Sequence, residues 1–105
     1  MKTQNQFNKY YSFDNSKLFP NLNGSNFRIK FDKISNDDFF ILEYYSDGEK
    51  KMIKGIGIFA NIQEVLTLVI SFDSFVNKFF VEHNDDFSKI TLTSNNQVFE
   101  LNLIE

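Results

Sequence analysis

The chain has 105 residues, a formal net charge of −3 and no cysteine. A single domain of this length can bury a hydrophobic core without crosslinks, and the lack of cysteine excludes disulfides, thiolate zinc sites and cysteine nucleophiles. The negative net charge argues against a general nucleic-acid binder, because such proteins depend on neutralising phosphates.

Residue types with AT-rich codons dominate the composition. Phenylalanine alone accounts for 14 residues, whereas glycine accounts for 4 and proline for 1. This bias indicates a gene from an AT-rich bacterium or from one of its phages. The first residues contain no apolar segment of the kind found in signal peptides, and no apolar run approaches the length of a membrane span. We therefore expect a protein of the bacterial cytosol, without a membrane partner.

The first predicted element is a short amphipathic helix over residues 3–13. Phe7, Tyr10 and Tyr11 stand at helical spacing. Turn-forming residues follow, including an Asn23-Gly24-Ser25 turn, so residues 1–26 specify less structure than the rest of the chain. Residues 27–34 then alternate strictly between apolar and charged side chains, which predicts a half-buried strand.

Residues 38–59 form the clearest predicted element, a β-hairpin around Asp47-Gly48. A type I′ turn needs positive φ at both central positions, which Asp and Gly tolerate, and it sets the register of both strands. We expect the ring of Phe40 to lie across Gly55 and a helix to approach Gly55 and Gly57 closely. The face assigned to the core consists of Phe40, Leu42, Tyr44, Ile53, Gly55, Gly57 and Phe59.

Residues 62–82 are predicted to form one long helix. Asn61 suits an N-cap, and Glu64 stands where a capping box places its acidic residue. Two alternatives remain: residues 66–72 can form a strand, because they are rich in β-branched side chains, or residues 71–74 can divide the segment into two helices. The apolar stripe of the helix consists of Ile62, Val65, Leu66, Val69, Val76, Phe79 and Phe80.

The last predicted element is a second hairpin, formed by residues 88–93 and 98–104 around Asn95-Asn96. Asparagine tolerates positive φ, and a two-residue turn here pairs Leu92 with Phe99. The same register places the apolar residues of both strands on one face, so turn geometry and alternation agree.

These elements predict a single α+β domain over residues 1–105. Its five-stranded antiparallel sheet has the element order β-β-β-α-β-β, with the long helix packed on one face and the short helix at the N-terminus. The order is also compatible with the type III secretion chaperone fold without its last helix, an analogy of fold alone.

No motif predicts catalysis or metal binding. Asn36-Asp37-Asp38-Phe39 recurs as Asn84-Asp85-Asp86-Phe87, and we interpret both as Asx turns because neither has the ligand spacing of a calcium loop. His83 is the only histidine, and we expect it at the end of the predicted helix, where the dipole favours it. We therefore expect no catalytic residues, no metal and no cofactor, and hence no enzyme.

The candidate partner-binding surface is the outer face of the first hairpin and of the strand before it. Aromatic and apolar side chains stand there among charged ones. This composition suits a protein-binding patch, a surface that stacks RNA bases, or an ordinary solvated face. The candidate residues are Arg28, Lys30, Phe39, Ile41, Glu43, Tyr45, Met52 and Lys54.

Size, acidity and codon bias together predict a small non-catalytic binding protein that inhibits or neutralises a macromolecular partner. Phage anti-defence inhibitors of the anti-CRISPR kind and toxin-immunity proteins are the two concrete versions, with a protein or a ribonucleoprotein as target. The alternative is an RNA-binding module that uses Arg28, Lys30, Tyr45 and Lys54. A secretion-chaperone-like homodimer is a further alternative.

Overall fold

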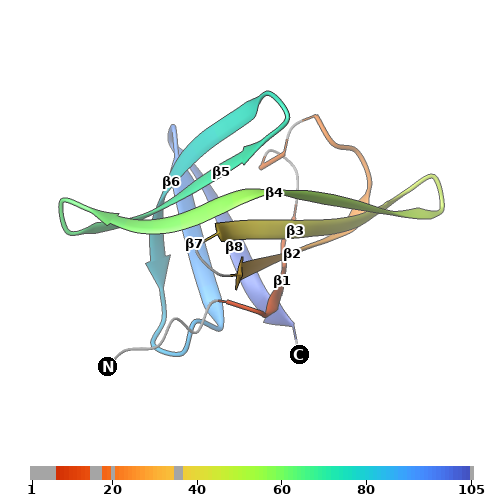
Figure 1. Ribbon diagram of the computed structural model, residues 1–105. Coiled ribbons are helices and arrows are strands. Elements are labelled where there is room, and N and C mark those ends of the chain that lie inside the picture. The colour runs from red at the N-terminus through yellow and green to blue at the C-terminus, as the bar shows by residue number, and fades with distance from the viewer. Residues whose placement is uncertain (1–6, 15–17, 20, 35–36, 105) are drawn as a thin grey trace.

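The computed structural model describes residues 7–14, 18–19, 21–34 and 37–104. Within them, eight antiparallel strands form a closed barrel in which each strand pairs with the next and β8 pairs with β1 (Figure 1). No helix in the described part of the chain is long and apolar enough to cross a membrane. The strands are β1 (Tyr10–Ser12), β2 (Ser25–Ile34), β3 (Asp37–Ser46), β4 (Glu49–Ile62), β5 (Val65–Phe72), β6 (Phe75–His83), β7 (Lys89–Ser94) and β8 (Gln97–Ile104).

Two-residue turns join several of these strands. Turns of this length match the right-handed twist of the flanking strands when both central residues have positive φ. Three turns meet this condition: Asp47-Gly48 with φ of 55° and 78°, Gln63-Glu64 with 52° and 67°, and Asn95-Asn96 with 53° and 66°.

The barrel interior is filled by side chains, many of them aromatic. The segment between β1 and β2 contributes Phe19, which is almost completely buried. Its ring centroid lies 6.1 Å from that of Phe40 in β3, and 5.7 Å from those of Phe72 in β5 and Phe75 in β6. Small eight-stranded barrels are just wide enough for such a packed core.

The predicted hairpins are confirmed. The pairs from Phe39–Ile56 to Ser46–Glu49 have the expected register, and so does the pair of Leu92 with Phe99. The strand over residues 27–34 is also confirmed, within β2. A Cβ added at Gly55 would lie 2.7 Å from Cε2 of Phe40, so the ring does pack against this glycine.

The helix predicted over residues 62–82 is wrong, whether as one helix or two, and the alternative strand over residues 66–72 is confirmed. The chain there forms the end of β4 and then β5 and β6. Asn61 is not an N-cap but pairs with Leu66 in the β4–β5 ladder. Burial follows a period of two: Phe79 is fully buried, whereas Phe80 is 56% exposed. Apolar residues on both faces of the strands produced the helical spacing.

The N-terminal helix is also wrong, because Tyr10–Ser12 is strand β1. The start of that predicted helix, residues 3–6, lies outside the described residues. Neighbouring Tyr10 and Tyr11 face opposite sides of β1, and only Tyr11 is fully buried. Adjacent aromatic residues thus belong to a strand with two covered faces, although their spacing from Phe7 also fits a helix.

The predicted α+β fold is therefore wrong, and the protein is an all-β barrel without a helix in the described residues. The analogy with secretion chaperones fails with it, because that analogy depended on a helix between two sets of strands. In the described residues, no helix approaches the glycines of β4. Instead, a Cβ at Gly55 would also lie 2.7 Å from Cβ of Phe72 and from the carbonyl oxygen of Ser71, both in β5.

Candidate functional site

Glu43 organises the outer surface of β2 and β3. Its side chain points away from the barrel interior, yet it is only 9% exposed because neighbouring side chains cover it. The Tyr10 hydroxyl donates a hydrogen bond of 2.7 Å to Oε2. Arg28 Nε and Lys50 Nζ lie 3.7 Å and 3.4 Å from Oε1. The carboxylate therefore holds three side chains from β1, β2 and β4 together.

This environment sets the charge of Glu43. Burial alone raises the pKa of a carboxyl group, but hydrogen bonds from Tyr10 and Lys50, together with the charges of Lys50 and Arg28, outweigh it and hold the pKa of Glu43 below its ordinary value. Burial and the hydrogen bond to this carboxylate raise the pKa of Tyr10. At neutral pH the pair is thus an ionised acceptor and a neutral donor.

Cations on this surface lie against aromatic rings. Cζ of Arg28 is 4.2 Å from the centroid of the Tyr10 ring, and Nζ of Lys30 is 5.1 Å from it. Nζ of Lys54 lies 4.4 Å from the centroid of the Phe39 ring. Contacts of this kind are favourable cation–π interactions. Arg28 and Lys30 both contact the ring of Tyr10, so a ligand that stacked on this ring would compete with two cations.

The structure brings all the predicted partner-binding residues onto one surface, formed by the outer faces of β2, β3 and β4. Arg28 pairs with Glu43 across β2 and β3, and Tyr45 pairs with Lys50 across β3 and β4. The partner-binding role of these residues stays a prediction. We call this surface the basic–aromatic face: Arg28, Lys30, Phe39, Ile41, Glu43, Tyr45, Met52 and Lys54, joined by Tyr10 and Lys50.

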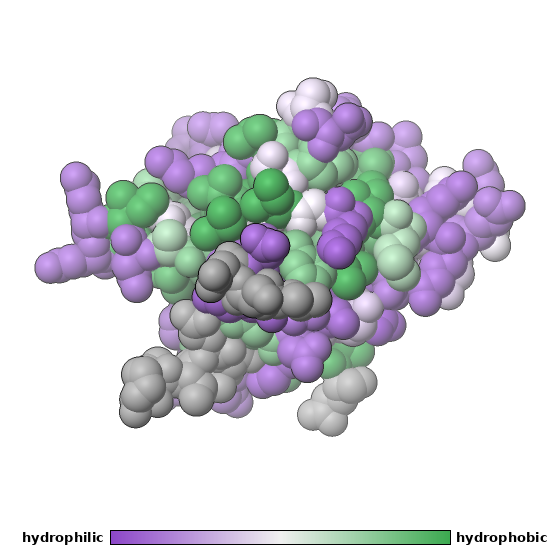
Figure 2. All heavy atoms as spheres, in the orientation of Figure 1, coloured by the Kyte–Doolittle hydropathy of each residue, from purple (hydrophilic) through white to green (hydrophobic). Residues whose placement is uncertain are grey.

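A second surface lies beside it, on the outer faces of β4, β5 and β6. Its large apolar side chains are between 40% and 69% exposed. On β5 and β6, the charged residues among the described outward positions are Lys78 and Glu82. Figure 2 shows the apolar spheres gathered over the front of the barrel, where β4 and β5 cross in Figure 1. We call this surface the apolar face: Ile56, Ile58, Ile62, Val65, Val76 and Phe80.

Sequence reasoning missed the apolar face because it assigned several of its members to the buried stripe of a helix. A usable signal was present. Alternation over residues 65–72 places Leu66, Leu68 and Ile70 on one side, which leaves Val65 and Val69 on the other. Sequence reasoning also missed Tyr10, since residues 3–13 were assigned to a helix.

The ring of His83 is held in place by its neighbours. It ends β6 rather than a helix, and its ring stacks on Phe87 with centroids 3.7 Å apart. Its Nδ1 donates a hydrogen bond of 2.7 Å to the carbonyl oxygen of Asn84. Both features hold the ring at the loop after β6 and leave one ring nitrogen for other partners.

The Asx turn predicted within Asn84-Asp85-Asp86-Phe87 forms at Asp86, whose side chain bonds the backbone two residues on, while Asn84 bonds the backbone five residues on. Asn84 Oδ1 accepts a hydrogen bond from the backbone N–H of Lys89, and Asp86 Oδ1 accepts one from that of Ser88, both at 3.1 Å. The first copy of the motif begins at Asn36, outside the described residues. Among the described residues, no group of three or more histidine, aspartate or glutamate side chains could hold a metal ion.

Comparison with known proteins assigns no family. No protein-family model matches the chain, and no curated protein matches it in sequence.

Proposed function

We propose that this is a non-catalytic binding protein that attaches to a protein partner through the apolar face and thereby inhibits or neutralises it. The observation that carries the proposal is the exposure of the apolar face, whose members reach 69% at Val76. Contiguous exposed apolar surface marks interaction sites in soluble proteins. Covering it with a partner contributes ~25 cal/mol for each Å² removed from water.

The basic–aromatic face fits the rim of such an interface. Strand β4 runs through both surfaces, because Met52 and Lys54 precede Ile56 on its outer side. Protein interfaces combine an apolar centre with a polar rim, and aromatic residues and methionine are enriched in them. Tyr45 and Met52, both exposed, are the members of this face that we expect to touch the partner.

The packed barrel, the small size and the acidity of the protein support an inhibitory role. A closed barrel with a packed interior is preorganised, so little conformational entropy is lost on binding. Small size, acidity and a composition rich in residue types with AT-rich codons suit a phage anti-defence inhibitor of the anti-CRISPR kind or a toxin-immunity protein of the bacterial cytosol. Such a protein acts by covering a functional surface of its target.

RNA binding through the basic–aromatic face has weaker support. Tyr45 stands exposed opposite Lys50, which suits stacking and phosphate contact. However, the Glu43 carboxylate already pairs with Arg28 and Lys50. An RNA ligand would have to compete with that carboxylate for the same cations.

Affinity capture from the host lysate, with and without ribonuclease, tests the proposal. We expect one stoichiometric protein that survives ribonuclease. Val76→Lys should reduce its recovery roughly tenfold or more, since a charge placed within the interface becomes desolvated. Tyr45→Ala should weaken recovery less, because Tyr45 stands at the rim. The control is Asp85→Lys, which places a lysine in the exposed turn after β6. This variant should capture as much of the partner as the parent protein does.

Other outcomes separate the hypotheses. Recovery of RNA alone, or of proteins lost on ribonuclease treatment, overturns the protein-partner proposal. If Tyr45→Ala abolishes capture while Val76→Lys does not, the basic–aromatic face is the binding surface. Thermal unfolding of each variant checks that the barrel is intact, and Val76→Thr provides a milder change at the same position.

A further inference from the structure

The sequence contains a single Asn-Gly pair, Asn23-Gly24, and it lies directly before β2. In such a pair the main-chain nitrogen of the glycine can attack the preceding side-chain amide, because glycine has no side chain to hinder the approach. Both residues are exposed and lie outside the strands. The pair therefore stands where the backbone is less constrained than it is within the strand ladders.

The groups that would react are not held by other contacts. In the described part of the chain, neither the side-chain amide of Asn23 nor the N–H of Gly24 forms a hydrogen bond. The amide can therefore turn toward the Gly24 nitrogen without breaking an existing interaction.

Packing requires glycine at position 24. A Cβ there would clash with the carbonyl oxygen of Tyr45 and would lie 2.9 Å from Cδ2 of Tyr44, both in β3. A larger residue would have to displace the backbone of β3, which a flexible side chain could not relieve. The fold thus requires at this position the residue type that makes Asn23 reactive.

We propose that Asn23 is a site of spontaneous deamidation. The Gly24 nitrogen loses its proton and attacks Cγ of Asn23, so that a C–N bond forms, the bond from Cγ to Nδ2 breaks, and Nδ2 takes up a proton and leaves as ammonia. Water then opens the five-membered imide at one of its two carbonyls. One opening gives aspartate, and the other gives isoaspartate, in which the main chain runs through the side-chain carbon.

The reaction consumes water, releases ammonia and needs no further reactant. Either product replaces a neutral amide by a carboxylate, so the modified chain is more negative than the net charge of −3 of the parent. The new carboxylate lies in a hollow of about 460 Å³ that Asn23 lines together with Tyr45 and Asp47. The inference does not depend on the function proposed above.

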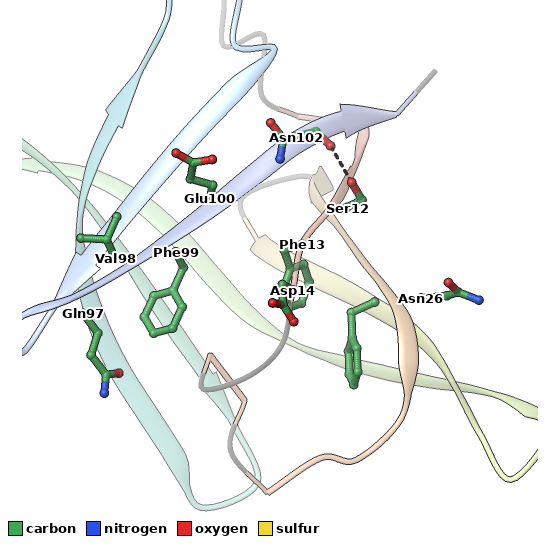
Figure 3. Close-up of a pocket in the computed structure, with 10 residues that line it drawn as sticks. Ser12, Phe13, Asp14, Asn26, Gln97, Val98, Phe99, Glu100 and Asn102 are labelled. Carbon is green, nitrogen blue, oxygen red and sulfur yellow. Dashed lines mark hydrogen bonds between the residues drawn. The ribbon is translucent and has the colours of Figure 1, made fainter.

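Asn26 provides a comparison within the same segment. It is exposed like Asn23, and Figure 3 shows its side chain pointing away from Phe13 and Asp14. It lies within β2, however, and the bulky Phe27 follows it. Both the strand and the ring hinder attack on its amide, so we expect Asn26 to react much more slowly.

Asp47-Gly48, the only Asp-Gly pair of the sequence, lines the same hollow as Asn23. Closing the same ring at Asp47 expels hydroxide, which is a poorer leaving group than ammonia. The pair of Ser46 with Glu49 also holds the turn. We therefore expect no comparable reaction at Asp47 in the folded protein.

Incubation of the full chain at neutral pH, followed by peptide mapping and mass spectrometry, tests the proposal. We expect the peptide that contains Asn23 to exchange NH₂ for OH, and an isoaspartyl methyltransferase with a labelled methyl donor to mark part of the product. The rate at Asn23 should exceed that at Asn26 roughly tenfold or more. It should rise with hydroxide concentration, because the Gly24 nitrogen must lose its proton.

The same incubation in urea measures what the fold contributes. The rate at Asn23 in the folded protein should lie within about threefold of the rate in the unfolded chain. The two products should also differ in stability. Isoaspartate lengthens the main chain beside Gly24, which already touches β3, so it should lower Tm, whereas aspartate should leave Tm unchanged.

Two variants provide controls. Asn23→Ser removes the amide and should abolish the reaction at this position, with Tm unchanged because the side chain is exposed. Gln97→Gly creates a second Asn-Gly pair at Asn96, where pairing with Ser94 holds the backbone. That pair should react roughly tenfold more slowly than Asn23.

Three results would overturn the proposal. The first is a rate at Asn23 no higher than that at Asn26. The second is a rate in the folded protein more than about tenfold below that in urea, which would show that the fold protects the amide. The third is an equal rate at Asn96 of the Gln97→Gly variant, since the dipeptide alone would then set the rate and the place of Asn23 outside the strands would contribute nothing.

Discussion

Leu42 shows how a single inward residue supports the barrel. It lies on β3 between Ile29 of β2 and Ile53 of β4, and its side chain is fully buried. Leu42→Ala should lower the free energy of unfolding by about 2–5 kcal/mol, through lost transfer free energy and the cavity left behind. Urea unfolding measures the change. Met52→Ala, on the outer face of the same hairpin, should change it by about 0.5 kcal/mol or less. A surface-like loss at Leu42 would contradict its assignment to the interior.

Tyr11 joins β1 to the loop after β6. Its side chain is fully buried, and its hydroxyl donates a hydrogen bond of 2.6 Å to the carbonyl oxygen of Phe87. Burial, with a contribution from the charge of Asp86, raises the pKa of Tyr11 to about 12. Because the pKa is higher in the folded chain, the stability linked to it is fully present below the ordinary value of 10.0 and is lost as pH rises through about 12.

Tyr11→Phe should lower the stability at neutral pH and weaken its dependence on alkaline pH. At pH 7 the variant should unfold more easily by about 1–3 kcal/mol, because the buried Phe87 carbonyl loses its donor. Above the ordinary tyrosine pKa of 10.0, its stability should fall less steeply with pH than that of the parent. Urea unfolding across this pH range measures both effects. Parallel pH profiles for the two proteins would show that Tyr11 does not titrate with folding.

At the scale of elements, the residue types in a turn decide whether the strands on either side of it can be predicted from the sequence. Asp47-Gly48 and Asn95-Asn96 consist of residues that tolerate positive φ, and both were predicted. Gln63-Glu64 adopts φ of 52° and 67° with long side chains. The left-handed region costs such residues about 1–2 kcal/mol each. The turn is therefore imposed by the strands on either side of it.

Replacing this turn by Asn-Gly should stabilise the protein. Gln63→Asn with Glu64→Gly relieves the left-handed backbone and should raise the free energy of unfolding by about 1 kcal/mol. That corresponds to a rise in Tm of about 4–8 °C for a chain of this size, measurable by calorimetry. Gly48→Gln is the matched opposite change, at φ of 78°, and should lower Tm. An unchanged or lowered Tm in the Asn-Gly variant would show that the native turn is not strained.

At the scale of the whole molecule, charge distribution distinguishes the two binding surfaces. The chain has a net charge of −3, but Arg28, Lys30, Lys50 and Lys54 lie on the basic–aromatic face, whereas the members of the apolar face are all uncharged. Binding through the apolar face should change the dissociation constant only about threefold or less between about 50 and 200 mM salt, whereas a ligand held by several phosphate contacts loses about 10³–10⁵ in affinity over that range. Calorimetry should also show a negative heat-capacity change. A steep salt dependence would instead identify a nucleic-acid ligand.

The candidate site was partly predictable. The register of the first hairpin already places Glu43, Tyr45 and Met52 on one outward side, and the structure keeps that arrangement. Tyr10 reaches Glu43 across 33 positions of sequence, a contact that exists only because β1 pairs with β2. No local pattern contains that information.

The sequence by itself determined the local geometry: the two hairpin registers, the inward side of β2 and the burial of Leu42. These follow from turn chemistry and from a period of two, both of which act over a few residues. Only the tertiary structure decided the fold of residues 62–82 and the closure of β8 onto β1. Apolar side chains occupy both faces of β5 and β6, so their pattern fits a helix as well as a strand. The choice depends on which neighbours bury each side, and strands distant in sequence provide those neighbours.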